Sequence, residues 1–142
     1  MTNPSDARIA RLLREAKRIA VVGLSSDPER PSYNIARDLL EYGYEIIPVN
    51  PREREVLGMR AYTSLAEVPG HIDIVDVFRN QNALIEHAME AVEVGAGAYW
   101  MQLGLASDEA ARIAAAGGLV VVQNCCILVE YARLVVHGAR IA

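Results

Sequence analysis

The strongest constraint on the fold is a regular alternation between short apolar runs and longer segments with helical spacing. Strands that are apolar along their whole length are typical of a parallel sheet covered on both faces. The predicted strands are Ile19 to Gly23, Glu45 to Val49, Ile72 to Phe78, Ala98 to Gln102 and Leu119 to Gln123. The predicted helices start at Asn3-Pro4 and then cover Tyr33 to Tyr42, Asn80 to Val94, Ser107 to about Ala116, and Ile127 to His137. The pattern predicts an α/β, doubly wound domain with a mainly parallel five-stranded sheet.

Length and charge limit the classes of protein that this chain can represent. Its 142 residues, of which 52% are hydrophobic, are enough for one domain with a real core, and we assign residues 1–142 to it. The net charge of −4 offers no basic surplus for nucleic acid or an anionic membrane surface. No apolar run approaches the roughly 20 residues of a membrane span, and the charged N-terminus does not resemble a secretion signal. We therefore expect a cytoplasmic protein.

The first apolar run leads into a loop with the chemistry of a phosphate site. Gly23 ends the run, Ser25 and Ser26 add hydroxyl groups, Arg30 adds a cation, and a helix is expected to start near Ser32. A strand, a glycine turn and a helix N-terminus together direct backbone N–H groups and the positive helix end at one point. This stretch therefore predicts a nucleotide-type binding site.

The same region disfavours NAD and a P-loop nucleotide. A dinucleotide fingerprint needs GxGxxG after the first strand and a carboxylate at the end of the second strand. The chain has GLSSDPERPS and then Asn50, Pro51 and Arg52, with no carboxylate where NAD would need one. GxxxxGK[ST] is also absent from the sequence. A cation at Arg52 suits an additional phosphate, as on NADP or coenzyme A, and the pattern alone leaves these two open.

The adjacent cysteines, Cys125 and Cys126, do not predict a disulfide or a zinc site. A thiol at Cys126 could exchange an acyl group or form a mixed disulfide if its pKa were lowered, but no histidine lies near it in sequence. No Ser-centred motif and no ligand-spaced pair of histidines is present either. We predict no catalytic residue and no metal. Asp76, near the carboxyl end of the third strand, is the aspartate whose position could bring it to the pocket.

The order of these motifs resembles a known family. VVGLSSDPERPSYNIARDLLEYGYEIIPVNP is followed by IDIVDVFR, YWMQLG and a closing C-I-x-V-E-Y. These segments resemble the small stand-alone CoA-binding proteins, which are similar to the CoA-binding domain of the succinyl-CoA synthetase α subunit. The resemblance extends from about Ala16 to Leu134. It implies a Rossmann-like domain that binds coenzyme A or an acyl-CoA and has no established catalytic activity.

The resemblance also implies which positions contact the ligand. The phosphate loop of the family corresponds to Gly23, Leu24, Ser25, Ser26 and Arg30, and the adenosine end corresponds to Asn50, Pro51 and Arg52. Val77, Phe78 and Arg79 would line the middle of the ligand, and Ser32, at the expected start of the second helix, completes the predicted binding residues. The alternatives are a small NADP-dependent reductase that uses the same pocket, and a CoA-responsive regulatory or partner subunit. Whether free CoA, an acyl-CoA or a CoA disulfide binds is open at this stage, as are the oligomeric state and any protein partner.

Overall fold

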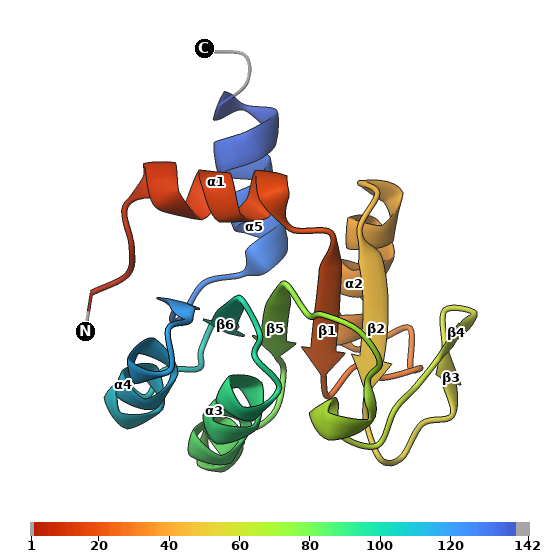
Figure 1. Cartoon of the computed structure of the whole chain (residues 1–142). Helices are drawn as coiled ribbons and strands as arrows, with labels where there is room; N and C mark the ends of the chain where they lie inside the picture. The colour runs from red at the N-terminus through yellow and green to blue at the C-terminus, as the bar shows by residue number, and fades with distance from the viewer. Residues whose placement is uncertain (1, 139–142) are drawn as a thin grey trace.

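The computed structural model describes residues 2–138 and contains one parallel sheet of five strands (Figure 1). The strand order is β2-β1-β5-β6-β7, and all neighbouring strands are parallel. The strands are β1 (Arg18–Val22), β2 (Glu45–Val49), β5 (Ile74–Val77), β6 (Ala98–Met101) and β7 (Val120–Val122). The α-helices are α1 (Asp6–Glu15), α2 (Pro31–Glu41), α3 (Leu84–Glu93), α4 (Asp108–Ala116) and α5 (Ile127–Tyr131). The predicted α/β, Rossmann-like fold is therefore confirmed.

Two hydrophobic cores lie on opposite faces of the sheet. Successive side chains of a strand point to opposite faces, so Ile19 and Val21 of β1 enter one core while Ala20 and Val22 enter the other. The helices α1, α2 and α5 cover the first face, and α3 and α4 cover the second (Figure 1). This double covering explains why most strand positions are apolar on both faces rather than alternating between apolar and polar.

The strand order creates a switch point at the carboxyl end of β1. The chain leaves β1 for β2 on one side and then crosses to β5 on the other side. Val22 lies opposite Val49 of β2 and Val77 of β5, so the three strands end at the same level. Ligands of open α/β sheets bind at this kind of edge.

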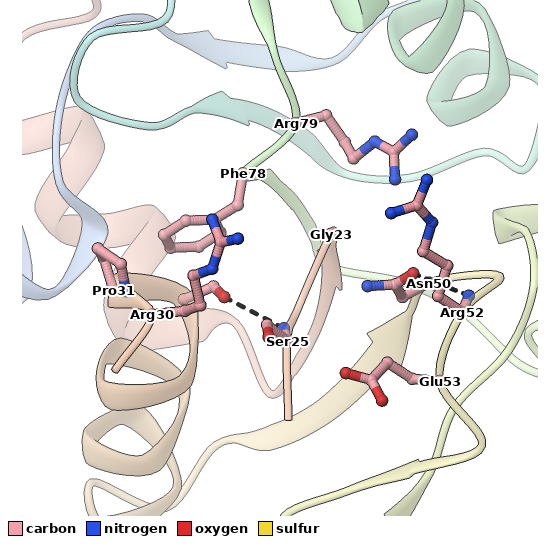
Figure 2. Close-up of a pocket in the computed structure, with 10 residues that line it drawn as sticks. Gly23, Ser25, Arg30, Pro31, Asn50, Arg52, Glu53, Phe78 and Arg79 are labelled. Atoms are coloured by element: carbon pink, nitrogen blue, oxygen red, sulfur yellow. Dashed lines mark hydrogen bonds between the residues drawn. The ribbon is translucent and has the colours of Figure 1, made fainter. Parts of the chain in front are cut away.

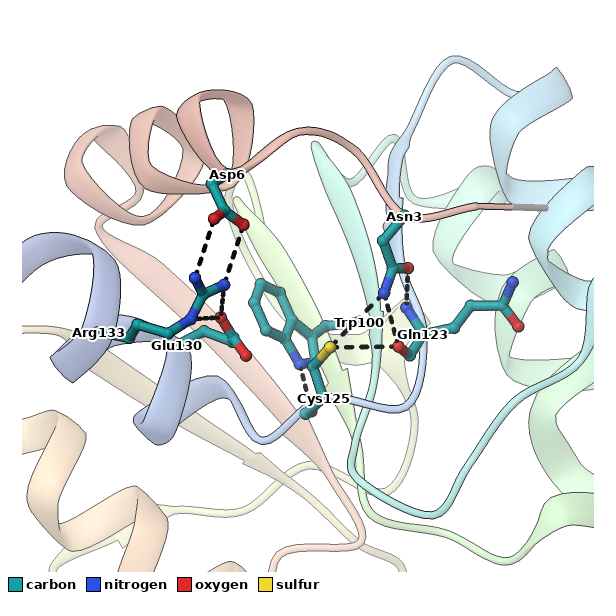
Figure 3. A network of polar contacts seen from close by, with 7 residues as sticks. All are labelled: Asn3, Asp6, Trp100, Gln123, Cys125, Glu130 and Arg133. Atoms are coloured by element: carbon teal, nitrogen blue, oxygen red, sulfur yellow. Dashed lines mark hydrogen bonds and ion pairs between the residues drawn. The ribbon is translucent and has the colours of Figure 1, made fainter.

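The predicted start of the first helix is wrong by a few residues. Ser5 is the N-cap residue, and its hydroxyl accepts a hydrogen bond from the Arg8 N–H. Asn3 instead lies against β7, where its side chain accepts from the Gln123 N–H (2.7 Å) and donates to the Gln123 carbonyl (3.0 Å) (Figure 3). A local capping signal at Asn3-Pro4 could not reveal this distant partner.

Other boundaries differ from the prediction in smaller ways. The second helix starts two residues early, because Pro31 takes the first helical position, which its missing N–H allows. The third helix is preceded by a 3-10 turn, η2 (Gln81–Ala83). The last helix continues beyond Tyr131 as a π-helix, η3 (Ala132–Val136). Ser107, at the expected start of the fourth helix, is the N-cap residue of α4, and its hydroxyl accepts from the Ala110 N–H (3.1 Å).

The segment between β2 and β5 forms a small hairpin beside the sheet. Its strands are β3 (Glu55–Val56) and β4 (Met59–Arg60), followed by the 3-10 turn η1 (Leu65–Glu67). Tyr62 continues from the hairpin and pairs with the carboxyl end of β2, where it exchanges backbone bonds with Pro48 and Asn50. Within residues 2–138, no helix is long and apolar enough to cross a membrane.

Asp76 does not reach the pocket, contrary to the expectation from its position. Its side chain is fully buried in the sheet, and neither carboxylate oxygen has a hydrogen-bond partner among the described residues. Burial raises the pKa of Asp76 well above its usual range, because an ionised carboxylate is costly in an apolar core. Asp76 is therefore a polar group of the core.

We expect Asp76 to make the protein less stable as the pH rises. The folded state holds this proton more tightly than the unfolded chain, so deprotonation above pH ~4 favours unfolding by up to about 1.4 kcal/mol per pH unit. Asp76→Asn should therefore gain stability relative to the wild type between pH 5 and pH 8, measured by urea unfolding at each pH. A difference between the two proteins that stays constant over this range would contradict the assignment.

Candidate functional site

A cavity of about 460 Å³ lies at the carboxyl ends of β1, β2 and β5 (Figure 2). Most of the predicted site residues line it: Gly23, Ser25, Arg30, Ser32, Asn50, Arg52, Phe78 and Arg79, together with Pro31 and Glu53. Three loops that are far apart in sequence thus meet at the switch point. We call this cavity the phosphate pocket, after the chemistry that its lining suits.

The other predicted residues lie around this pocket rather than in its wall. Leu24 and Val77 are fully buried, each in one of the two cores, so their side chains support the loops. Pro51 lines a neighbouring cavity, and Ser26 lies beside the phosphate pocket with its donors facing Glu53.

Gly23 has a conformation that a larger residue would strain. Its φ is +89°, and its N–H donates to the Val49 carbonyl (2.8 Å), which turns the chain sharply at the end of β1. A Cβ at this position would come within 3.0 Å of the Arg79 Cδ. The backbone angle therefore favours glycine, and a Cβ would in addition force the Arg79 side chain to shift by a few tenths of an ångström.

Side-chain hydrogen bonds fix the shape of the loop after Gly23. The buried Ser32 hydroxyl accepts from the Ser25 N–H (3.1 Å), and the Ser25 hydroxyl accepts from the Asp27 N–H (3.0 Å). Asn50 joins this loop to the end of β2, because its amide donates to the Leu24 carbonyl (3.1 Å). The loop is thus preorganised by its own hydroxyl groups, none of which caps α2.

Three arginines surround the phosphate pocket. Arg30 comes from the start of α2, Arg52 from the loop after β2, and Arg79 from the loop after β5. The Arg52 and Arg79 side chains extend towards the same part of the pocket in Figure 2. Among the residues that the structure describes, none of these three guanidinium groups forms an ion pair. Clustered, unpaired cations favour an anionic ligand with more than one charged group.

Glu53 is a pocket residue that the sequence analysis missed. Its alternation with Arg52, Arg54 and Glu55 is typical of a solvated surface, so the sequence pattern predicts no ligand contact for Glu53. In the structure its carboxylate accepts from the Ser26 N–H (2.6 Å) and from the Ser26 hydroxyl (2.9 Å). A turn that begins at Asn50 brings Glu53 back over the pocket, and only the fold reveals this contact.

Two further cavities adjoin the phosphate pocket. One, of about 390 Å³, is mainly apolar; it shares Pro31, Phe78 and Arg79 with the phosphate pocket and reaches Gln102 and Cys126. The other, of about 210 Å³, lies between Pro51, Arg79 and α3. The three cavities thus lie next to one another, and the Arg79 side chain lines all of them.

The reactive side chains nearest to the three cavities are two cysteines and one histidine. Cys126 reaches the apolar cavity, while partial burial raises the pKa of the neighbouring Cys125 thiol, which makes that thiol less reactive. His71 and His137 are exposed, whereas His87 lines the 210 Å³ cavity and is hydrogen-bonded to Glu90 (2.6 Å). Across residues 2–138, no group of three His, Cys, Asp or Glu side chains could hold a metal.

Comparisons with known proteins identify similar chains. The family model described as CoA binding domain matches residues 17–132. The uncharacterized protein YneT of Bacillus subtilis is 46% identical over 132 residues, which are 93% of this chain and 98% of that protein. The α subunit of an ADP-forming acetate–CoA ligase from Pyrococcus furiosus is 38% identical over 78 residues, and the match spans 17% of its length. A hypothetical protein of Pyrococcus horikoshii has a similar structure, with a TM-score of 0.89 and 37% identity over 94% of this chain and 97% of that one.

We expect Gly23→Ala to be more costly than the same change at a glycine with free space around it. Gly43 also has a positive φ, +102°, but a Cβ there would meet nothing within 4 Å. Gly43→Ala should cost about 1 kcal/mol through backbone strain alone. Gly23→Ala should cost about 1 kcal/mol more, because Arg79 must also move. Chemical unfolding of both variants measures the difference, and equal costs would contradict the close approach at Gly23.

Proposed function

The chain belongs to the CoA-binding domain family, and we propose that it binds coenzyme A or an acyl-CoA in the three neighbouring cavities at the carboxyl ends of the strands. The observation that carries this proposal is the cluster of Arg30, Arg52 and Arg79 around a preorganised loop in a chain with a net charge of −4. Coenzyme A has a pyrophosphate and a 3′-phosphate, which suit a pocket with several separate cations.

Each part of the ligand matches one part of the site. The pyrophosphate would bind the loop that starts at Gly23, where the backbone turns and Arg30 lies close by. The 3′-phosphate would bind Arg52, beside Asn50 and Pro51 at the adenosine end. The adenine base would enter the 210 Å³ cavity, and the pantetheine arm would follow the apolar cavity past Phe78 towards Cys126.

The proposal is a binding function and includes no reaction. The acetate–CoA ligase subunit is much longer than this chain, which spans 17% of it, so its activity is not carried over. The apolar cavity contributes only Cys126 as a nucleophile, and no histidine lines that cavity to activate it. Gln102, which also lines the cavity, is already engaged by the Ile127 N–H (2.9 Å).

Calorimetric titration with CoA, dephospho-CoA and NADP in parallel tests the proposal. We expect CoA to bind with micromolar affinity, and dephospho-CoA to bind about tenfold more weakly, a loss of about 1.4 kcal/mol. Arg52→Ala should weaken CoA binding to the level of dephospho-CoA and should leave dephospho-CoA binding unchanged, because the variant lacks only the partner of the 3′-phosphate.

Arg54→Ala is the matched control. Arg54 is an exposed arginine two residues further along the same loop, and it lines none of the three cavities. An equal effect of Arg52→Ala and Arg54→Ala would indicate general charge attraction and contradict the position of the 3′-phosphate. Tight binding of NADP without binding of CoA would contradict the proposed function and favour the reductase alternative.

A further inference from the structure

The carboxylate of Glu53 accepts hydrogen bonds from two donors of the phosphate loop, the N–H and the hydroxyl of Ser26. On the proposed function, these are donors that a bound phosphate would use. From this contact we propose that Glu53 is an internal competitor for the loop, which a bound phosphate group must displace. The inference rests on the proposed function, and it adds a residue that determines affinity and selectivity at the same site. It concerns a side chain that the sequence pattern assigns to a solvated surface.

The geometry of the contact resembles the way in which a phosphate binds. One carboxylate oxygen accepts from the Ser26 N–H (2.6 Å), and the other accepts from the Ser26 hydroxyl (2.9 Å). Two acceptor oxygens on one anion therefore engage a backbone donor and a hydroxyl donor of the same residue. Short hydrogen bonds to an ionised acceptor are about twice as strong as neutral ones, so breaking this contact costs the ligand binding free energy.

Glu53 can leave the loop without disturbing the fold. Its side chain bonds to nothing else in the described part of the chain, and its backbone is held separately, by a bond from its N–H to the Asn50 carbonyl (3.2 Å). The phosphate loop keeps its own internal bonds, such as the one from the Ser25 N–H to Ser32. Rotation of one half-buried side chain would therefore free the Ser26 donors.

The surrounding charges decide which ligands can displace Glu53. Its carboxylate lies in the same pocket as Arg30, Arg52 and Arg79, which attract it and the ligand alike. A ligand with one phosphate would exchange one anion for another and gain little. A ligand with several phosphates would also bind the arginines, and these added contacts would offset the loss of the contact between Glu53 and Ser26. Glu53 thus favours polyphosphorylated ligands over simple anions.

The test is calorimetric titration of CoA into the wild type, Glu53→Gln and Glu53→Ala. We expect both variants to bind CoA about tenfold more tightly, because no charged acceptor has to leave the loop. Glu55→Gln is the matched control: it removes the same charge two residues away, from an exposed side chain on β3 that lines none of the cavities. It should bind CoA with an affinity within about twofold of the wild type.

The outcomes separate this inference from the proposed function. If the wild type binds CoA and the Glu53 variants bind it equally well or more weakly, the competitor role is overturned. Weaker binding would mean that Glu53 itself contacts the ligand, for example by accepting from ribose hydroxyl groups. If none of the proteins binds CoA, the proposed function fails, and inorganic pyrophosphate becomes the probe. Tighter binding of pyrophosphate by both Glu53 variants than by Glu55→Gln would then support the competitor role, and any other result would overturn it.

Discussion

The pairing of β1 with both of its neighbours is the interaction on which the site depends. Parallel hydrogen bonding to β2 and β5 aligns Val22 with Val49 and Val77, so the loops after the three strands leave the sheet at one level. Residues from positions 23, 50 and 79 can therefore line one cavity although they are far apart in the chain. The cores on both faces hold this alignment, because each strand contributes side chains to both.

The site itself is held together by polar contacts between loops. Asn50 bridges the end of β2 to the loop after β1, and Ser32 binds that loop from the first turn of α2. These neutral bonds fix the backbone, while the arginines carry the charge. The bonds of Asn50 and Ser32 thus hold the backbone of the pocket without involving the arginines.

The sequence allowed prediction of the sheet, most helices and most of the lining of the phosphate pocket, because these follow from local signals. An apolar run such as the one from Ile19 to Val22 indicates a buried strand, and Gly23 at its end indicates a turn.

One common reason explains why the predicted surroundings were wrong for Asn3, Asp76 and Glu53. Their surroundings come from segments far away in sequence: β7 for Asn3, the packed interior for Asp76, and the loop after β1 for Glu53. Local composition cannot supply such partners. The π-helical end of the last helix was likewise beyond the reach of helical spacing alone.

The contact between Asn3 and β7 affects how the sheet ends. An edge strand offers unpaired N–H and C=O groups to which the strand of a second molecule can add. The Asn3 side chain bonds to both the N–H and the carbonyl of Gln123, as a further strand would (Figure 3). Close by, an ion pair between Arg133 and Asp6 joins η3 to the start of α1. At the opposite edge, Tyr62 covers the end of β2. Each edge of the sheet is therefore covered at one short stretch, beside Gln123 and at the end of β2. Loss of the residues around Asn3 would leave the backbone groups of Gln123 free to pair with the strand of a second molecule.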